Sequence, residues 1–250
     1  MGQGAPVREV QLHDMTSSAN VKHGTSEASV VEFRPQLKVA RIAEEEPPHF
    51  DSSSFAVADT SQAVEFLIRL LDVVGALGIL TLTFPVMLLA AVLIKLTSRG
   101  GVFYRQERVG KNGRIFELVK FRTMIDDAEK HVGPVWAVRD DHRITPVGRI
   151  LRRTRLDELP QLYNILCDHM SLVGPRPERP FFVERHKALQ GARLVVKPGL
   201  TGLAQVRSFY DLKPAHKVKY DYLYIQNRSL LLNIYILLRT VPVLFTKKGW

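Results

Sequence analysis

The chain of 250 residues contains a single cysteine, Cys167, so it can form neither an intramolecular disulfide nor a cluster of cysteine metal ligands. It also lacks the GxxxxGK and strand-linked GxGxxG loops that cradle nucleotides, the HExxH zinc motif and the GxSxG motif of serine hydrolases. Any phosphate must therefore be bound in another way. A reducing compartment fits this cysteine usage best.

Residues 1–60 lack sustained hydrophobic periodicity, and no basic start is followed by an apolar core, so we expect no cleavable signal peptide. Their segment EEEPPHFDSSS combines an acidic run, a proline pair and a serine triplet. This composition predicts a disordered polar tail over residues 1–60.

Acidic residues are scarce after the tail. Residues 66–250 hold 30 Lys and Arg against 15 Asp and Glu, whereas residues 1–65 hold 5 against 10. Such a positive excess indicates an anionic partner, which could be nucleic acid, an anionic membrane face or a phosphorylated substrate. The apolar run described next and the lack of interleaved basic and aromatic residues argue against nucleic acid.

Charge is missing from the 22 residues between Asp72 and Lys95, VVGALGILTLTFPVMLLAAVLI. At roughly 1.5 Å per residue this run is long enough to cross a hydrocarbon core of roughly 30 Å. Pro85 lies near its middle and should kink the helix, so the run could instead bend back out of the leaflet that it entered. The cations that follow the run predict a cytoplasmic location for that end, and both topologies stay open on these grounds.

Short strands and helices follow the apolar run, so the expected fold class is α+β. Strands are predicted at Val102–Tyr104 and Ile115–Phe121, joined by a tight turn at GKNG. Loops are predicted at LVGPRPERP and VKPGLTGLAQV, and helices over 144–166 (trimmed or kinked by Pro146 and Pro160), 213–227 and 230–245. The last helix could be a buried core helix, but we favour partial contact with a membrane surface.

Asp157 and Glu158 follow four arginines, at positions 149, 152, 153 and 155. Nearby positive charge favours ionised carboxylates, and neighbouring residues on a helix point about 100° apart, so the two should have separate roles. A permanently ionised aspartate can attack phosphorus, and a second carboxylate can hold the metal that such chemistry needs. The alternative is an exposed helix with i,i+3 and i,i+4 salt bridges.

Arg176 lies between two prolines in the segment GPRPE. The prolines stiffen the backbone, so the guanidinium group is presented at little entropic cost, and its planar fork suits a diphosphate. A tight structural turn is the alternative explanation for this segment.

Four segments together carry a resemblance: FYRQERVGKNGRIFELVKFRTM, RRTRLDELPQLYNIL, MSLVGPRPE and KPGLTGLAQV. In this order, and after one proline-broken hydrophobic helix, they resemble the bacterial sugar transferase family, the monotopic phosphoglycosyl transferases of exopolysaccharide and glycan synthesis. The resemblance covers about residues 66–250 and implies a re-entrant membrane helix over 66–98. A small, mostly helical cytoplasmic catalytic domain with short strands and interfacial helices would follow over 99–250.

The resemblance implies transfer of sugar 1-phosphate from a UDP-sugar to undecaprenyl phosphate at the cytoplasmic face of the bacterial inner membrane, with release of UMP. It implies that Asp157 forms a covalent phosphosugar intermediate and that Glu158 holds Mg²⁺. Substrate-binding positions match Arg152, Arg176 and Asp221. Lys197 is a further candidate for substrate binding, but it stands where the family often has an arginine, which keeps the charge and loses the bidentate fork.

Several features stay open or depart from the family pattern. Phe84 precedes Pro85 where the family usually has serine, so only Thr81 or Thr83 could cap the freed backbone. His169 is a local replacement rather than a catalytic base. No signature identifies the hexose. The sequence leaves the oligomeric state open, with a homodimer favoured. A membrane-tethered basic scaffold without catalysis is the alternative to the transferase.

Overall fold

The structure is a computed structural model that describes residues 60–126, 128, 141–207 and 214–245. The predicted disordered tail therefore lies outside the described residues, apart from its last position. Helices and strands are mixed, which confirms the expected α+β class. The larger elements in chain order are α1 (Gln62–Thr97), β1 (Phe103–Val109), β2 (Ile115–Phe121), α2 (Pro146–Arg153), α3 (Gln161–Leu166), β3 (Ser171–Val173), α4 (Pro180–Arg185), β4 (Gly199–Thr201), α5 (Leu203–Arg207), α6 (Pro214–Gln226) and α7 (Leu230–Phe245). Short 3-10 turns lie between them: η3 (Lys111–Gly113), η4 (Leu156–Glu158), η5 (Lys187–Leu189) and η6 (Gly191–Leu194).

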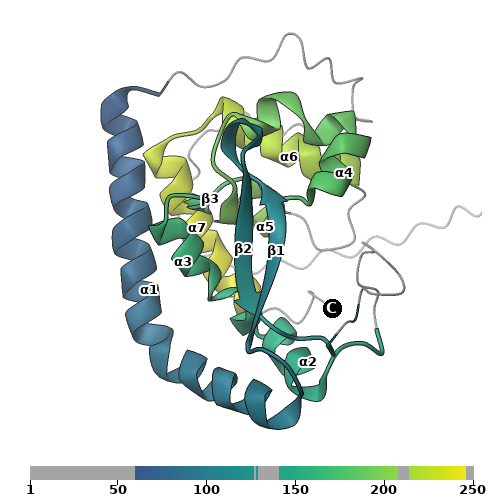
Figure 1. Ribbon diagram of the computed structural model, residues 1–250. Helices are drawn as coiled ribbons and strands as arrows, with labels where there is room; N and C mark the ends of the chain where they lie inside the picture. Colours follow the sequence, from purple (N-terminus) through teal and green to yellow (C-terminus); the bar gives the residue numbers. More distant parts are fainter. Residues whose placement is uncertain (1–59, 127, 129–140, 208–213, 246–250) are drawn as a thin grey trace, which may run out of the picture. The chain divides into compact units, whose positions relative to one another are not determined.

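The first element, α1, is a continuous helix of 36 residues. Within the described parts of the chain it is the one helix long and apolar enough to cross a bilayer, and little of its most apolar stretch is buried. Figure 1 shows a bend between its two halves. Pro85 lies inside the helix and cannot donate a backbone hydrogen bond.

The two threonines before Pro85 do not compensate for it as expected. The carbonyl group that lacks its helical donor is that of Thr81, four residues before the proline. The hydroxyl of Thr81 donates to the Leu77 carbonyl at 2.9 Å, and that of Thr83 donates to the Ile79 carbonyl at 2.7 Å. Each hydroxyl thus donates to the carbonyl four residues before it, and neither donates to the free carbonyl of Thr81. The capping prediction is therefore wrong.

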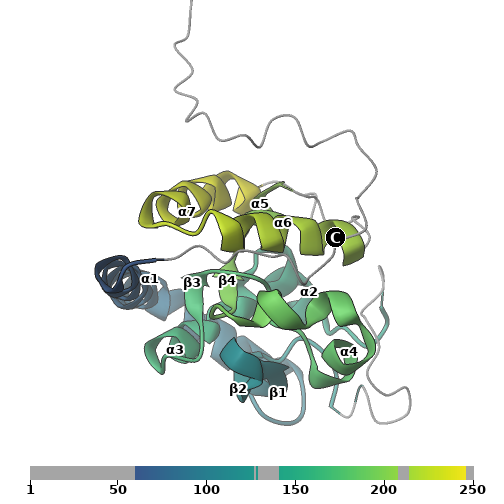
Figure 2. The same ribbon diagram turned by 90° about the horizontal axis from the view of Figure 1, so that it is seen from above.

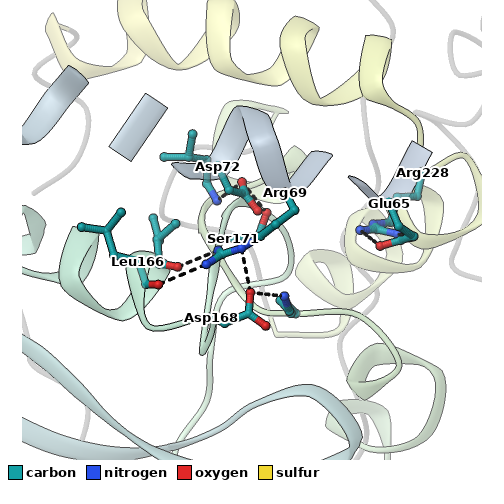
Figure 3. Close-up of polar contacts among 10 residues, drawn as sticks. Glu65, Arg69, Asp72, Leu166, Asp168, Ser171 and Arg228 are labelled. Carbon is teal, nitrogen blue, oxygen red and sulfur yellow. Dashed lines mark hydrogen bonds and ion pairs between the residues drawn. The ribbon is translucent and has the colours of Figure 1, made fainter. Parts of the chain in front are cut away.

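The first half of α1 is tied to the rest of the fold by charged side chains (Figure 3). Arg69 donates to the carbonyl oxygens of Ile165 and Leu166 at 2.8 and 3.1 Å, and its Nε lies 2.9 Å from Oδ1 of Asp168. Glu65 forms an ion pair with Arg228. The end of α3 and the connection between α6 and α7 thereby hold this part of the helix.

Asp72 is a buried carboxylate one turn further along α1. Its Oδ1 accepts hydrogen bonds from the hydroxyl of Ser171 at 2.9 Å and from the backbone amide of Leu172 at 2.8 Å. A carboxylate this far from water is stable only with such donors. Asp72 therefore fixes α1 to β3.

The second half of α1 returns to the same fold. Ala90 and Ile94 are buried against Phe121 of β2 and Leu151 of α2. At the end of the helix, the guanidinium of Arg122 donates to the carbonyl and hydroxyl oxygens of Ser98. Both halves of α1 therefore contact one compact set of elements.

The strands β1 and β2 form the predicted antiparallel hairpin, with Phe103 opposite Phe121 and Val109 opposite Ile115. Its turn is closed by a hydrogen bond from the Gly110 amide to the Arg114 carbonyl at 2.8 Å, and residues 112 and 113 have left-handed backbones with φ of 57° and 77°. Asparagine and glycine adopt this conformation at low cost, so the turn prediction is confirmed. The first strand is longer than predicted.

The helix predicted over 144–166 is wrong as a single element, because the chain divides there into α2, η4 and α3. The hydroxyl of Thr145 accepts from the Gly148 amide at 2.9 Å and begins α2, with Pro146 in its first turn. Arg155 has a left-handed backbone with φ of 61°, which ends the helical path. Pro160 then begins α3.

The loop predicted at VKPGLTGLAQV is also wrong, because it contains β4 and α5. The strand β4 pairs in parallel with β3, which occupies the start of the loop predicted at LVGPRPERP. The backbones approach so closely that a Cβ on Gly199 would lie 2.0 Å from the amide nitrogen of Gly174. Glycines at this pairing allow the close approach but add no apolar side chain to the sequence. The segment therefore shows no strand-like hydrophobic alternation, which explains why a loop was predicted.

The predicted helices over 213–227 and 230–245 are confirmed as α6 and α7. Figure 2 shows them on one side of β3 and β4, with α3 and the hairpin on the other. The main core lies between these layers and includes Leu162 and Ile165 of α3, Tyr224 and Ile225 of α6 and Ile236 of α7. One face of α7 is left uncovered, with exposed side chains at Leu231, Ile234, Leu238, Val241 and Leu244.

Candidate active site

Asp157 and Glu158 lie in the 3-10 turn η4, which starts directly after the left-handed Arg155. This backbone conformation is uncommon for a residue with a side chain and is retained mostly at functional sites. The Asp157 residue is buried, with 7% of its surface exposed. Asp157 is therefore held in the interior of the fold by this tight turn.

Two cations come from elements packed beside η4. Arg152, in the last turn of α2, is buried, and its Nε donates to Thr123 Oγ1 at 2.7 Å. Lys120 lies on β2, close enough to act electrostatically on both carboxyl groups. Burial lowers the pKa of Lys120 to about 8, although the negative charge of Asp157 acts to raise it. Desolvation of this ammonium group thus outweighs the attraction of the acids.

Arg176 approaches from the loop between β3 and α4. Its Nη2 donates to Glu158 Oε1 at 2.6 Å, and its Nη1 lies 3.5 Å from Oε2. Burial alone would raise the pKa of Glu158, but the charge and hydrogen bonds of Arg176 outweigh it and lower this pKa to about 2. Glu158 is therefore ionised at any physiological pH.

Asp157 behaves differently from the sequence-based expectation. Burial, followed by the negative charge of Glu158, raises the pKa of Asp157 to about 6, although Lys120, Arg152 and Arg176 act in the opposite direction. The prediction that arginines keep this carboxylate permanently charged is therefore wrong in direction. The group still loses its proton near neutral pH, in a setting where desolvation leaves the anion poorly stabilised.

Four of the six residues predicted for the site are brought together, namely Asp157, Glu158, Arg152 and Arg176. The other two lie elsewhere. Lys197 Nζ contacts Asp168 Oδ1 at 2.5 Å. Asp168 is also bound by Arg69 of α1 (Figure 3). Asp221 is buried in α6 and accepts a hydrogen bond from Arg193 Nε at 2.8 Å.

The sequence reasoning missed three cations near this site. Lys120 and Arg108 belong to the hairpin segment that carries the family resemblance, where Lys120 acts on the acids and Arg108 donates to the Pro177 carbonyl in the loop of Arg176. Arg193 lies in a stretch without a motif. Alternation along β2 could have suggested Lys120, since the strand alternates between exposed and buried positions up to Leu118.

The carboxylates of the site are enough to hold a metal ion only when a bound ligand supplies further oxygen atoms. Among the described residues, no group of three or more His, Cys, Asp or Glu side chains converges. Mg²⁺ is usually held by one or two carboxylates, with water and substrate phosphates in the other positions. Glu158, with Asp157 beside it, offers those carboxylates, and the longer contact of Arg176 leaves Oε2 the freer oxygen.

A buried carboxylate, a second carboxylate ionised by an arginine and several converging cations define a site for a phosphorylated ligand. Comparison with known proteins agrees with this class. The bacterial sugar transferase family matches residues 63–247, and the chain belongs to this family. The expectation drawn from the four sequence segments is thereby confirmed.

Three relatives illustrate the similarity. The chain is 44% identical over 192 residues to the UDP-glucose:undecaprenyl-phosphate glucose-1-phosphate transferase of Caulobacter vibrioides, covering 74% of this chain and 72% of that protein. It is 36% identical over 216 residues to the exopolysaccharide production protein ExoY of Rhizobium meliloti, covering 79% and 96%. It is 42% identical over 190 residues to the UDP-N-acetylgalactosamine-undecaprenyl-phosphate N-acetylgalactosaminephosphotransferase of Aeromonas hydrophila, covering 74% and 45%. The chain thus spans less than half the length of some relatives that it matches.

Proposed function

We propose that the protein transfers sugar 1-phosphate from a UDP-sugar to undecaprenyl phosphate and releases UMP. The observation that carries this proposal is the setting of Asp157. Its carboxyl group is buried, which raises its pKa, and the positive charges of Lys120, Arg152 and Arg176 act to lower this pKa. A desolvated carboxylate among cations is suited to attack a phosphorus atom whose oxygens those cations neutralise. The names of the relatives support the substrate pair.

In the proposed first step, a carboxylate oxygen of Asp157 attacks the sugar-bearing phosphorus of the UDP-sugar. A bond from that oxygen to phosphorus forms, and the bond from the same phosphorus to the oxygen bridging it to UMP breaks. UMP leaves with the electron pair. In the second step a phosphate oxygen of undecaprenyl phosphate attacks the same phosphorus and displaces Asp157, which regenerates the free carboxylate.

The remaining side chains bind and orient phosphate groups in this proposal. Arg176 presents a planar fork from a loop stiffened by prolines, and Arg152 is held by Thr123. Glu158 would hold Mg²⁺, which neutralises charge on the phosphoryl oxygens when it is bound. Phosphate contacts for Lys197 and substrate contacts for Asp221 stay predictions, because each is paired with another side chain.

The proposal includes a re-entrant α1, with the catalytic domain on the cytoplasmic face of the bacterial inner membrane. A helix that spans the bilayer leaves its two ends on opposite sides. Here Arg69 and Asp72 in the first half and Ile94 in the second half contact the same compact fold. Entry and exit on one side account for both sets of contacts, and the uncovered face of α7 suits an interfacial helix.

The decisive experiment gives the purified full chain, in lipid nanodiscs with Mg²⁺, a panel of UDP-glucose, UDP-galactose and their N-acetyl forms, with undecaprenyl phosphate to measure turnover and without it to detect the adduct. We expect UMP release with at least one donor and a mass increase of one sugar phosphate on the peptide containing Asp157. Asp157→Asn should abolish the adduct and reduce turnover at least about 10³-fold. Asp126→Asn, which makes the same change at an exposed position, is the matched control.

The same experiment distinguishes the transferase from the membrane-tethered scaffold. Binding to anionic liposomes without UMP release from any donor would refute the transferase and favour the scaffold. An adduct on a residue other than Asp157 would refute the assignment of the nucleophile. The predicted homodimer is a separate matter, which light scattering of the nanodisc-free protein in detergent would test.

A further inference from the structure

The loop that carries Arg176 is held in place by its backbone carbonyl groups. Four consecutive residues, 175 to 178, each accept a hydrogen bond from a donor outside the loop. The pairs are Gly199 N to Pro175 O at 2.9 Å, Arg193 Nη2 to Arg176 O at 2.6 Å, Arg108 Nη1 to Pro177 O at 3.0 Å and Val109 N to Glu178 O at 3.0 Å.

These outside donors determine the conformation of the loop. Pro175 and Pro177 have no backbone N–H, so the loop cannot be closed by the amide-to-carbonyl bonds of an ordinary turn at these positions. Its carbonyl groups instead take donors from β4, η6 and β1. Two of the four donors are guanidinium groups, so side chains set the backbone of the loop as much as secondary structure does.

Arg193 is the donor to the Arg176 carbonyl and is itself fixed. Only 4% of its side chain is exposed, and its Nε donates to Asp221 Oδ2 at 2.8 Å, so one guanidinium bridges α6 and the loop. The planar fork of an arginine gives such a bridge a defined direction. Asp221 therefore determines where the Arg193 donor to the loop points.

We propose that Arg193, oriented by Asp221, is a positioning residue that fixes the backbone of Arg176 and so holds the Arg176 guanidinium on Glu158. The contacts run from the Asp221 carboxylate through Arg193 to the Arg176 carbonyl, and from the Arg176 side chain to Glu158. The side chain of Arg176 is 45% exposed, so little else restrains it between its fixed backbone and its contact with Glu158. This inference rests on the proposed function and gives Asp221 a role without contact to substrate.

The test is a double-mutant cycle on kcat/KM for UMP release. Arg193→Met combined with Asp221→Leu removes both charges of the buried pair and avoids leaving one of them uncompensated. We expect this pair of substitutions to reduce kcat/KM about 10- to 100-fold in the wild-type background, which is the range of one charge-assisted contact. In an Arg176→Gln background the same pair should change kcat/KM by less than about twofold, because the group that it positions is gone.

Equal losses in the two backgrounds would overturn the inference, because a general loss of structure adds to the effect of Arg176→Gln rather than disappearing into it. Arg105→Met is the matched control. Arg105 is an exposed arginine of β1 that pairs with Glu117 at 3.4 Å, and its removal should leave kcat/KM unchanged in both backgrounds. A wild-type protein without UMP release would instead refute the proposed function.

Hydrogen exchange of the loop provides a readout that needs no turnover. The amides of Val109 and Gly199 donate to carbonyl groups of the loop, so mass spectrometry of peptides that contain them should show faster amide exchange in the Arg193→Met, Asp221→Leu protein than in wild type, and no change in Arg105→Met. Unchanged exchange at these amides would overturn the inference even if turnover falls.

Discussion

The Nη2 atom of Arg176 lies 2.6 Å from Oε1 of Glu158, and this contact makes two neighbouring carboxyl groups chemically unlike. Burial opposes ionisation of Glu158, but Arg176 outweighs it and lowers the pKa to about 2. Burial, followed by the charge of Glu158, raises the pKa of Asp157 to about 6. One acid is therefore always an anion, and the other gains or loses its proton just below neutral pH.

The first prediction concerns the pH dependence of the proposed covalent step. In the proposed mechanism Asp157 attacks only when deprotonated, so kcat/KM for UMP release should fall below pH about 6, approaching tenfold per pH unit. The rate should be measured in a single turnover without undecaprenyl phosphate, so that the ionisation of the acceptor does not enter. A rate that stays constant down to pH 5 would contradict the role of burial at Asp157.

Lys120→Met should move this acidic limb to higher pH. The ammonium group of Lys120 lowers the pKa of Asp157, so its removal leaves burial and the charge of Glu158 less opposed. Lys187→Met, at an exposed position in η5, is the control and should leave the limb in place. A limb that moves to lower pH in Lys120→Met would show that the two groups do not interact as described.

Asp157→Asn should stabilise the protein while abolishing turnover. The raised pKa means that the folded state binds the proton more tightly than the unfolded state, so stability is lost as pH rises from about 4 to about 6. At pH 7.5 a neutral amide should recover about 1 to 3 kcal/mol, seen as a higher melting temperature. The gain should shrink toward pH 4, and an equal gain at both pH values would argue against an electrostatic origin.

Gly148→Ala should push α2 away from Thr123, the residue whose hydroxyl accepts a hydrogen bond from Arg152. A Cβ at Gly148 would lie 2.0 Å from the Thr123 carbonyl oxygen and 2.7 Å from its carbonyl carbon, so backbone must move. We expect a loss of about 1 to 3 kcal/mol in the free energy of unfolding, with lower turnover, because Arg152 donates to Thr123 Oγ1. Gly78→Ala, in α1 with no atom within 4 Å, should be neutral or stabilising by up to about 1 kcal/mol.

The topology of α1 should depend on its buried polar contacts. Asp72→Leu combined with Arg69→Leu removes the bonds to Ser171, Leu172 and α3 and lengthens the apolar run. We expect part of this variant to expose an N-terminal tag on the periplasmic side of spheroplasts, where the wild-type tag is protected from protease. Leu82→Ala, at an exposed position of the same helix, is the control. Periplasmic cleavage of the wild-type tag would contradict re-entry.

Local patterns predicted the elements that depend on local physics. The turn at GKNG was identified because asparagine and glycine tolerate left-handed backbone, and α7 because apolar residues recur at helical spacing. The division of residues 144–166 was missed, because Arg155 adopts a left-handed backbone that no propensity of arginine suggests. Such a conformation is stabilised by the surrounding fold.

The candidate site likewise contains residues that the sequence identified and contacts that it did not reveal. Asp157, Glu158, Arg152 and Arg176 were found because the residue types and the family segments point to them. The contacts of Lys197 with Asp168 and of Asp221 with Arg193 join residues 29 and 28 positions apart, which no periodic pattern encodes. The direction of the Asp157 pKa also depends on burial, a property of the assembled fold rather than of the neighbouring arginines.

The β1–β2 hairpin helps to hold the loop that carries Arg176, although the hairpin lies far along the chain from Asp157 and Glu158. Val109 and Arg108 at the end of β1 supply donors to Glu178 and Pro177, and Val109 stands opposite Ile115 at the mouth of the turn. A one-residue shift of the strand register would reverse which side chains face the loop. The pairing of an exposed hairpin thus affects the proposed active site, and a grafted turn that changed this pairing would alter the site as well as the surface.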